Sequence, residues 1–538
     1  MLAWCGNGIE TKYSGSVNSI KYIFSVLLLL NILSLGGLVK AGPEEYPNIL
    51  LITADDLGWD SLGCMGNELT GLTPNLDRLA AEGLLLTHGF VATPICGPSR
   101  QALFTGRHPQ SNGMLGHGTQ PPKWWKTTRN NADTQSITTE LWKKGYLTGM
   151  IGKHGSQWCQ FSQPPHGDND QTGMGRNPEK FSRFTLDFLT QAKEKNKPFF
   201  LSINTHDPHR YWARHPSESI DWIRKMMGGA SWKALDNGKP YPDPQTKFAP
   251  AKCPVPAPYP KEEKIREVLA TYYDSVNRMD QIIGEVLTVL EKCGNKENTV
   301  VIFLSDHGMA WDLSKWSLYP SGVRTPIIIR WPSRIKRGQT DSKSVISVVD
   351  IAPTIAEICG LQEYVRTDGE SFAGRLTGKK QAWNRSWAFS CFNYMNNDPK
   401  IDETIQAYSK NLFQKFDQYR PSRSLNNRDF CYVWNGWADG ATELPPSMLG
   451  EFHFLLPDLV KNPSDLEYGN YLTKHNFIKL RAREELYNVK TDPGCHHNLA
   501  LVAKYQGKLE EVRNQMKNTL RKTGDHELAS YLYFLDVK

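Results

Sequence analysis

The twelve residues CGPSRQALFTGR, Cys96 to Arg107, combine a nucleophile with a cation at a fixed spacing. Arg100 lies four residues after Cys96, so the two side chains share a face if the segment is helical. Pro98 favours a helix that begins at this point, which puts Cys96 at the positive end of the helix dipole. Such an end is a good place to hold an anion. The alternative for Cys96 alone is a buried free cysteine in a loop.

Acidic residues and histidines follow three apolar runs that have the character of buried strands. Asp55-Asp56 follow residues 48–53, His206-Asp207-Pro208-His209-Arg210 follow residues 198–203, and Asp306-His307 follow residues 299–304. Layered α/β proteins build their sites at the carboxyl ends of their strands, so we expect these groups to share one crevice. Each segment alone is equally consistent with a turn. All three together with the Cys96 motif indicate a functional site.

The adjacent carboxylates of Asp55 and Asp56 require a cation if they are buried. With Asp306 they form an all-oxygen set of hard ligands, which suits calcium or magnesium rather than zinc. The chain has ten cysteines, and none forms a C-x-x-C pair. The sequence therefore predicts a hard-cation site and no zinc cluster.

The elements that position these residues are indicated by apolar runs at 48–53, 198–203, 299–304 and 326–330 and by a long amphipathic pattern over 262–290. Continuous β-branched runs suit a sheet that is covered on both faces. Strands that alternate with helices predict a layered α/β fold. After residues 383–386 the pattern becomes irregular, with short aromatic stretches and a final helix near 502–520. We therefore expect a catalytic domain over 42–385 and a smaller C-terminal α+β subdomain over 386–538.

The N-terminal segment has the pattern of a signal peptide. Lys12 and Lys21 precede an apolar run over 22–35, and Val39-Lys-Ala41 gives a small-x-small cleavage pattern. Polar interruptions in the run weaken the alternative, a single membrane anchor. We expect residues 1–41 to be removed and the protein to be exported without a stable membrane span. Export permits disulfides, which the sequence alone cannot pair.

The bulk composition limits the partners. The formal net charge is +7 over 538 residues, which is mild, and no long Lys/Arg run is present. This argues against nucleic acid as a partner. A single glycosylation sequon, Asn384-Arg385-Ser386, favours a bacterial periplasm or exterior, with the lysosome as the alternative if the source is eukaryotic.

The motifs resemble those of the type I sulfatases, the formylglycine-dependent members of the alkaline-phosphatase-like superfamily. CGPSRQALFTGR is similar to the family signature, and segments 48–56, 304–308 and 485–500 resemble the two metal motifs and a C-terminal motif. Residues 206–210, 273–280 and 481–487 are similar to the heparan N-sulfatase (sulfamidase)-like subgroup. The resemblance implies an alkaline-phosphatase-like fold: a large mixed sheet flanked by helices, with a smaller C-terminal α+β domain.

The resemblance also implies a role for each candidate residue. A formylglycine-generating enzyme would convert Cys96 into the nucleophile, and Ca2+, or alternatively Mg2+, would be bound by Asp55, Asp56, Cys96, Asp306 and His307. The sulfate oxygens would be neutralised by Arg100, Lys153 and Lys315. Gly152-Lys153-His154 is one residue shorter than the family's Gly-Lys-x-His segment, in which the histidine contacts formylglycine. His206, which matches a family His-x-Pro pattern, is favoured as the residue that protonates the leaving group, with His209 as the alternative, and Asp207 and Arg210 would bind the sugar.

The implied activity is hydrolysis of a sulfate ester or N-sulfate on a sulfated oligo- or polysaccharide such as a glycosaminoglycan. Two alternatives stay open at this point. One is a phosphonate or phosphodiester hydrolase of the same superfamily, because sulfate and phosphate esters are similar in shape. The other is a secreted glycan-binding protein without activity, against which the presence of every motif argues.

Overall fold

The structure is a computed structural model. It describes residues 46–117, 135–153, 159, 161–162, 172, 175–209, 242–257, 259–361, 364, 366–378, 383–393, 419–440 and 480–537. Pro47–Lys538 forms one compact unit, and Met1–Tyr46 is separate from it. The predicted signal peptide over 1–41 therefore lies outside the described residues.

A large mixed sheet is the centre of the compact unit. Its strands run in the order β3-β4-β1-β5-β6-β2-β7, with β8 paired to β2. Their bounds are β1 Asn48–Ala54, β2 Leu84–Phe90, β3 Leu147–Gly152, β4 Phe199–Asn204, β5 Thr299–Ser305, β6 Arg324–Arg330, β7 Gln339–Asp341 and β8 Ile346–Ser347. Every residue of β1, β4 and β5 is buried, as expected for strands covered on both faces. The four apolar runs predicted to be strands are confirmed as β1, β4, β5 and β6.

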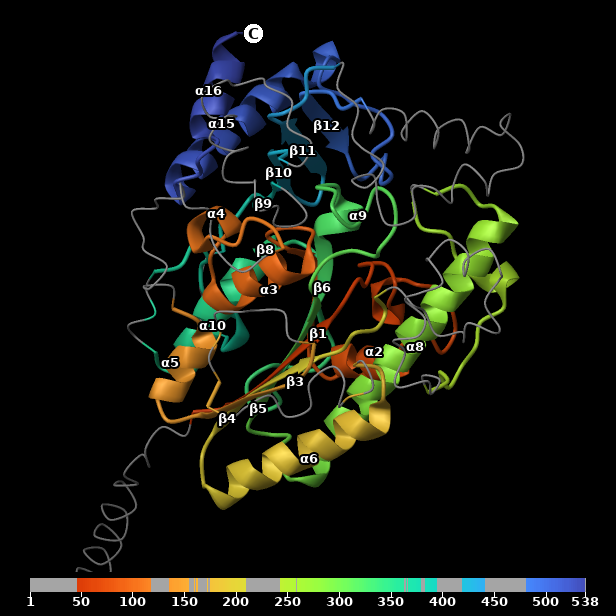
Figure 1. Ribbon diagram of the computed structural model, residues 1–538, viewed down its shortest axis with the longest axis vertical. Coiled ribbons are helices and arrows are strands. Elements are labelled where there is room, and N and C mark those ends of the chain that lie inside the picture. Colours follow the sequence, from red (N-terminus) through yellow and green to blue (C-terminus); the bar gives the residue numbers. More distant parts are fainter. Residues whose placement is uncertain are drawn as a thin grey trace, which may run out of the picture. The chain divides into compact units, whose positions relative to one another are not determined.

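Helices cover the two faces of this sheet (Figure 1). One group packs together as α2 Pro74–Ala81, α6 Pro178–Glu194 and α8 Glu263–Lys292. The other group is α3 Cys96–Thr105, α5 Ile137–Lys143 and α10 Ile351–Ile358. The helix predicted over 262–290 is confirmed as α8, whose apolar residues face the core. Among the described residues, we find no helix with the length and apolar character needed to cross a membrane.

A second, antiparallel sheet follows in the order β12-β11-β10-β9. It consists of β9 Ala388–Phe392, β10 Ser422–Asn426, β11 Phe430–Asn435 and β12 Glu484–Asn488. Helices α15 Gln506–Thr523 and α16 Leu528–Asp536 pack on it around Trp434, Tyr531 and Met516. The predicted α/β fold with a smaller α+β part is thus confirmed. The exact boundary near residue 385 stays a prediction, because both sheets belong to one compact unit.

One edge of the large sheet gathers the ends of its central strands. β1, β3, β4 and β5 are parallel, so their carboxyl ends meet at this edge. β6 is antiparallel to β5, and therefore its first residue, Arg324, lies at the same edge. β2 is antiparallel to β6 and ends beside it, with Phe90 opposite Arg324. The sheet thus presents the ends of six strands along one line.

Candidate active site

Helix α3 begins at Cys96 and places this residue at the sheet edge. The preceding Ile95 is extended, so the helix starts directly at the cysteine. The Cys96 side chain is buried, with Sγ 3.4 Å from Asp55 Oδ1 and 3.1 Å from His307 Nε2. The cysteine, the residues after β1 and the residues after β5 therefore meet at one point.

Arg100 ties three strand ends together from inside the protein. Its Nε donates to Asp306 Oδ2 at 2.9 Å. Its Nη1 donates to Thr53 Oγ1 at 2.6 Å and to Asn204 Oδ1 at 3.0 Å. In this structure the guanidinium thus orients the carboxylate of Asp306, and its contact with a sulfate oxygen stays a prediction.

Three carboxylates lie side by side next to Cys96. Asp55, Asp56 and Asp306 are at most 1% exposed. The backbone N–H of Asp56 points at Asp306 Oδ1 at 3.3 Å. Asp56 also has a left-handed backbone with φ 62°, which is unfavourable for a residue with a side chain and is characteristic of functional sites. Backbone strain is therefore stored where the two acidic motifs meet.

Two lysines contact these carboxylates. Lys153 Nζ contacts Asp55 Oδ2, and Lys315 Nζ lies 2.9 Å from Asp56 Oδ1. Lys153 follows Gly152, where φ is +89° and a Cβ would lie 2.1 Å from the carbonyl oxygen of Asn204. Only glycine fits this close approach. The approach fixes the backbone position from which the Lys153 side chain extends.

The cluster has the donor atoms of a metal site. Ligand atoms of Asp55, Cys96, Asp306 and His307 all lie within 4.8 Å of one another, and the same holds for Asp55, Asp56, Cys96 and His209. His307 Nδ1 lies 2.8 Å from the carbonyl oxygen of Gly308, which leaves Nε2 directed at the carboxylates. A ligand histidine is commonly oriented through its other ring nitrogen in this way.

The pKa values of the acidic groups are shifted in different directions. Burial raises the pKa of Asp306 to about 6, and the neighbouring charge of Asp55 adds to the effect. Burial would lower the pKa of His307, but Asp306, Cys96 and Asp56 raise it to about 10. A divalent cation would compensate the charges of the neighbouring carboxylates.

The pKa of the Cys96 thiol is lowered, in contrast to that of Asp306. Burial would raise its pKa, but the charges of Lys153, Lys315 and His307 lower it well below the ordinary value of a cysteine. The surroundings of Cys96 therefore stabilise a negative charge at the position of its Sγ atom.

The turn after β4 carries the two histidines predicted to act on the leaving group. The His206 and His209 rings lie 4.7 Å apart, and a cis peptide joins Asp207 to Pro208 between them. His209 Nε2 is 3.3 Å from Lys315 Nζ and 3.7 Å from Asp56 Oδ2. Burial and the charge of Arg176 hold the pKa of His206 well below its usual range. His209 is therefore the histidine that contacts the acidic cluster.

Asp207 has its carboxylate occupied by arginines. Arg278 donates to both oxygens, at 2.7 Å from Nε and 3.0 Å from Nη2, and Arg176 Nε lies 2.9 Å from Oδ1. All three side chains are at most 1% exposed. Arg176 Nη2 also donates to the carbonyl oxygen of His209 at 3.2 Å. This buried triad fixes the histidine turn, and sugar binding by Asp207 stays a prediction.

The segment after β5 folds back on itself. The N–H of Gly308 donates to the carbonyl oxygen of Gly322 at 2.9 Å. A Cβ on Gly308 would lie 1.9 Å from the carbonyl oxygen of Ser321, and one on Gly322 would lie 2.2 Å from that of Ser314. The backbone contacts at these two glycines close the loop that carries Asp306, His307 and Lys315.

Comparison with known proteins identifies this arrangement. The family model described as Sulfatase matches residues 47–361, which is more than half of the chain. The chain belongs to the sulfatase family. This sulfatase therefore hydrolyses sulfuric esters, and the alternative of a glycan-binding protein without activity is not supported.

Individual relatives cover most of the chain. Human N-sulphoglucosamine sulphohydrolase is 28% identical over 499 residues, covering 91% of this chain and 92% of its own length. An ulvan-active sulfatase from Formosa agariphila is 27% identical over 492 residues, covering 90% and 81%. A solved structure in complex with its substrate D-glucosamine-2-N,6-O-disulfate has a TM-score of 0.59 at 19% identity, covering 90% of this chain and 99% of its own. The last comparison shows the alkaline-phosphatase-like fold.

The sequence did not reveal every residue of this sulfatase's site. Arg176 and Arg278 were missed, although Arg278 lies in the otherwise apolar stripe of α8, where a buried cation signals a buried partner. His117, which hydrogen-bonds to the Cys96 side chain, was also missed. Two predicted site residues, His154 and Arg210, lie outside the described residues.

Proposed function

We propose that this sulfatase removes sulfate, as an O-sulfate ester or an N-sulfate, from a sulfated glycan, with formylglycine derived from Cys96 as the nucleophile. The observation that carries the proposal is the position of Cys96 Sγ, 3.4 Å from Asp55 and 3.1 Å from His307, among buried carboxylates and lysines. The names of the human and Formosa relatives, which concern a sulfated glucosamine and ulvan, support a glycan as the substrate.

Conversion of Cys96 explains why a thiol stands at this position. A thiol attacks a sulfate ester poorly, whereas the hydrated aldehyde of formylglycine supplies one oxygen for attack and a second for release of sulfate. The residues that would hold a divalent cation are Asp55, Asp56, Asp306, His307 and the group derived from Cys96. Such a cation, calcium or magnesium, acts as a Lewis acid on a sulfate oxygen.

The remaining polar residues have separate tasks in this proposal. The ammonium groups of Lys153 and Lys315 lie beside the acidic cluster and neutralise sulfate oxygens as charge redistributes. Arg100 orients Asp306. A sugar hydroxyl or amine is a poor leaving group, so a histidine must protonate it. The contacts of His209 with Lys315 and Asp56 favour it for this task, and His206, which the sequence favoured, becomes the second candidate.

The proposal is tested by measuring released sulfate on defined substrates. The panel contains an N-sulfated and a 6-O-sulfated glucosamine oligosaccharide, an ulvan oligosaccharide, an aryl sulfate and an aryl phosphodiester. We expect sulfate release from at least one glycan, and none from the Cys96→Ala variant. A higher kcat/KM on the phosphodiester than on every sulfate would contradict the proposal and favour a phosphodiester hydrolase.

We also infer that the protein is exported, on the strength of the signal-peptide pattern over 1–41. Among the described cysteines the structure contains no disulfide. N-terminal sequencing of the protein from the extracytoplasmic fraction tests the inference. A mature chain that begins near residue 42 supports it, and an uncleaved chain in the cytoplasm contradicts it.

A further inference from the structure

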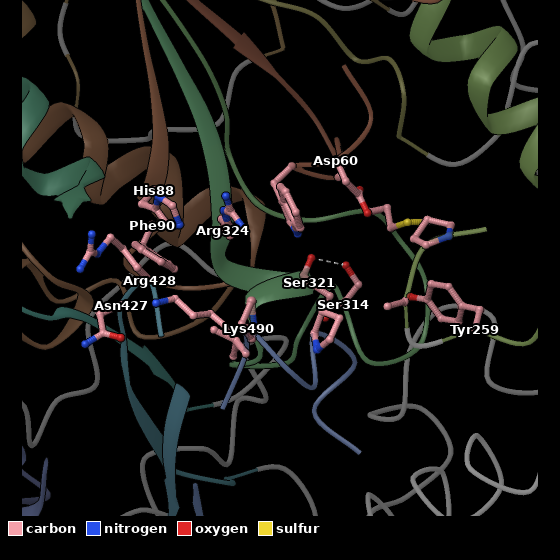
Figure 2. A pocket seen from close by; sticks show the side chains of 18 residues that line it. Asp60, His88, Phe90, Tyr259, Ser314, Ser321, Arg324, Asn427, Arg428 and Lys490 are labelled. Atoms are coloured by element: carbon pink, nitrogen blue, oxygen red, sulfur yellow. Dashed lines mark hydrogen bonds between the residues drawn. The ribbon is translucent and has the colours of Figure 1, made fainter. Parts of the chain in front are cut away.

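A second cavity lies beside the site, along the same edge of the large sheet. It has a volume of about 230 Å3, and its walls include Trp59, Asp60, His88 and Arg324, together with Arg428, which lies between β10 and β11, and Lys490, which follows β12. Figure 2 shows His88, Arg324, Arg428 and Lys490 on one side of the pocket and Tyr259 on the other. None of these residues belongs to the acidic cluster.

The topology places the cavity next to the site. The acidic cluster lies at the ends of β1 and β5, whereas Arg324 begins β6 and Phe90 ends β2. Neighbouring strands lie about 4.8 Å apart, so β2 is about 10 Å from β5 along the edge. Ser314, in the cavity wall, directly precedes Lys315 of the site. A glycan that places one sugar at the acidic cluster can place a linked sugar at the cavity.

The lining is cationic and aromatic. The Arg324 guanidinium carbon lies 3.7 Å from the centroid of the Trp59 ring, and its Nε and Nη2 donate to the carbonyl oxygen of Thr87 at 2.9 and 2.8 Å. Lys490 Nζ lies 2.6 Å from Asp429 Oδ1. Arg428 is exposed, and the structure shows no ion pair between it and another described residue. The lining thus includes the cations of Arg324, Arg428 and Lys490 and the carboxylate of Asp60, and Lys490 is paired with Asp429 just outside the lining.

Burial dominates the titration of the groups in the cavity. Burial lowers the pKa of His88, and the charges of Arg324 and Arg428 lower it further, to about 4, against the charges of Asp429 and Asp341. Burial likewise lowers the pKa of Arg324, to about 10, against the opposing charge of Asp60, and it raises the pKa of Asp60. A bound anion is therefore favoured by the guanidinium groups themselves and not by burial.

We propose that this cavity is a second anion subsite, in which Arg428 and Arg324 bind a sulfate or carboxylate group on a sugar linked to the one that is desulfated. The proposal rests on the proposed function, since it assigns the substrate an additional anionic group. Guanidinium groups pair with both kinds of oxyanion through two parallel N–H donors. The enzyme therefore recognises an oligosaccharide with repeated negative charges rather than an isolated sulfated sugar.

Arg428 is the residue to change, because it is exposed and its removal leaves the fold intact. Arg324→Ala is the second variant and not the first, because that arginine also hydrogen-bonds to β2 and its removal changes a contact of the fold. The matched control is Arg337→Ala, an exposed arginine that does not line the cavity. Each change is made in the full-length chain with Cys96→Ala, so that binding is measured without turnover.

The test is calorimetric titration with a heparin-derived tetrasaccharide, an ulvan-derived tetrasaccharide and the corresponding sulfated monosaccharides. The comparison uses whichever of the two tetrasaccharides the parent binds more tightly. We expect Arg428→Ala to reduce the affinity for this tetrasaccharide by about tenfold and to change the affinity for its monosaccharide much less. Arg428→Lys should recover part of the loss, and Arg337→Ala should match the parent. A tetrasaccharide that keeps its carboxylates and the sulfate to be removed, but lacks its other sulfates, shows which oxyanion is bound: Arg428-dependent binding identifies the carboxylate, and its loss identifies the sulfate.

Three results would overturn the proposal. The first is an equal affinity of the parent and Arg428→Ala for both tetrasaccharides. The second is an equal loss of affinity for the tetrasaccharide and its monosaccharide, and the third is a parent that binds neither tetrasaccharide more tightly than the monosaccharide. Sulfate release by the enzyme with Cys96 intact is measured separately, so failure of the proposed function is distinguishable from failure of the subsite.

Discussion

At the scale of single residues, chemistry is concentrated at Cys96 and at the two histidines after β4. Cys96 is buried at the start of α3, and its Sγ contacts polar atoms of Asp55 and His307 rather than apolar side chains of the core. His209 contacts the acidic cluster, whereas His206 lies behind it, with its ring against that of His209. These differences underlie the two predictions that follow.

We predict that Cys96→Ala abolishes sulfate release and changes the free energy of unfolding by less than about 1 kcal/mol. The reason is that the residue supplies the nucleophile and not a core contact. Peptide mass spectrometry of the active enzyme should show formylglycine at position 96. Cys359→Ala, which changes another buried cysteine, is the control and should keep activity. An active enzyme that carries only unmodified Cys96 would refute the prediction.

We predict that the true general acid is recognised by its dependence on the leaving group. His209→Ala should reduce turnover of a sulfated sugar by about 100-fold or more, and turnover of an aryl sulfate far less, because an aryl oxide leaves without a proton. His206→Ala should reduce both by similar factors. The measurement is kcat for each variant on both substrates. Equal losses on both substrates for His209→Ala would mean that it is not the acid.

At the scale of elements, buried ion pairs fix how helices meet strands. Arg278 of α8 and Arg176 before α6 hold Asp207 after β4. In the antiparallel part, Arg423 of β10 donates to both oxygens of Asp525, which follows α15, at 2.7 and 2.9 Å. Removing one partner from such a pair leaves a buried charge uncompensated.

We predict that Asp207→Asn lowers the free energy of unfolding by about 3 to 5 kcal/mol, because two buried guanidinium groups lose their counter-ion. The comparison is Lys143→Ala, which removes an exposed ion pair on α5 and should cost less than about 0.5 kcal/mol. Urea denaturation of both variants measures the difference. Similar stability of the two variants would show that the Asp207 triad is not structural.

We predict an acid-dependent contribution from Asp525. Burial would raise its pKa, but Arg423 outweighs burial and holds the pKa below the ordinary value of 3.8. The unfolded carboxyl therefore binds a proton at higher pH than the folded one does. The stabilisation is complete above about pH 4 and is lost as the pH falls through the folded pKa.

The measurement compares the parent with Asp525→Asn in denaturant at pH 7, 5, 4 and 3. The stability gap between the two should be constant from pH 7 to 5 and should shrink below pH 4. A gap that widens on acidification would contradict this assignment.

At the scale of the whole molecule, the site is assembled from segments that are far apart in the sequence. Lys315 contacts Asp56 across 259 positions, and Arg100 reaches Asp306 across 206. The loops that follow β1 and β5 and the start of α3 must all be in place before any carboxylate has its partners. A bound cation would therefore stabilise the folded chain as well as the reaction.

We predict that chelation abolishes sulfate release and lowers the melting temperature, and that calcium or magnesium restores both. A ligand at 100 times its Kd stabilises the native state by about 2.7 kcal/mol. Asp56→Asn should remove activity and the response of the melting temperature to calcium. Full activity after removal of all metal would exclude the cation from the reaction.

Many of the strands and site residues could be predicted from the sequence, because the patterns that indicate them are local. Buried strands such as 48–53 and 299–304 are recognised by their continuous apolar residues. The acidic residues that follow them lie at the carboxyl ends of the strands, where such sheets form their sites. β3, with Gly149 inside it and Gly152 at its end, has no such signal, so it was not predicted. The Asp207–Arg278 pair depends on a contact across 71 positions, which no local pattern encodes.

The back-folded loop after β5 has a consequence for how this enzyme can vary. Because the backbone contacts at Gly308 and Gly322 leave no room for a methyl group, neither position tolerates even alanine. Deep mutational scanning scored by activity should therefore find no active substitution at these two glycines, although neither belongs to the acidic cluster or the cavity. Changes of specificity must then arise at other positions, such as the exposed Arg428 on the rim of the cavity.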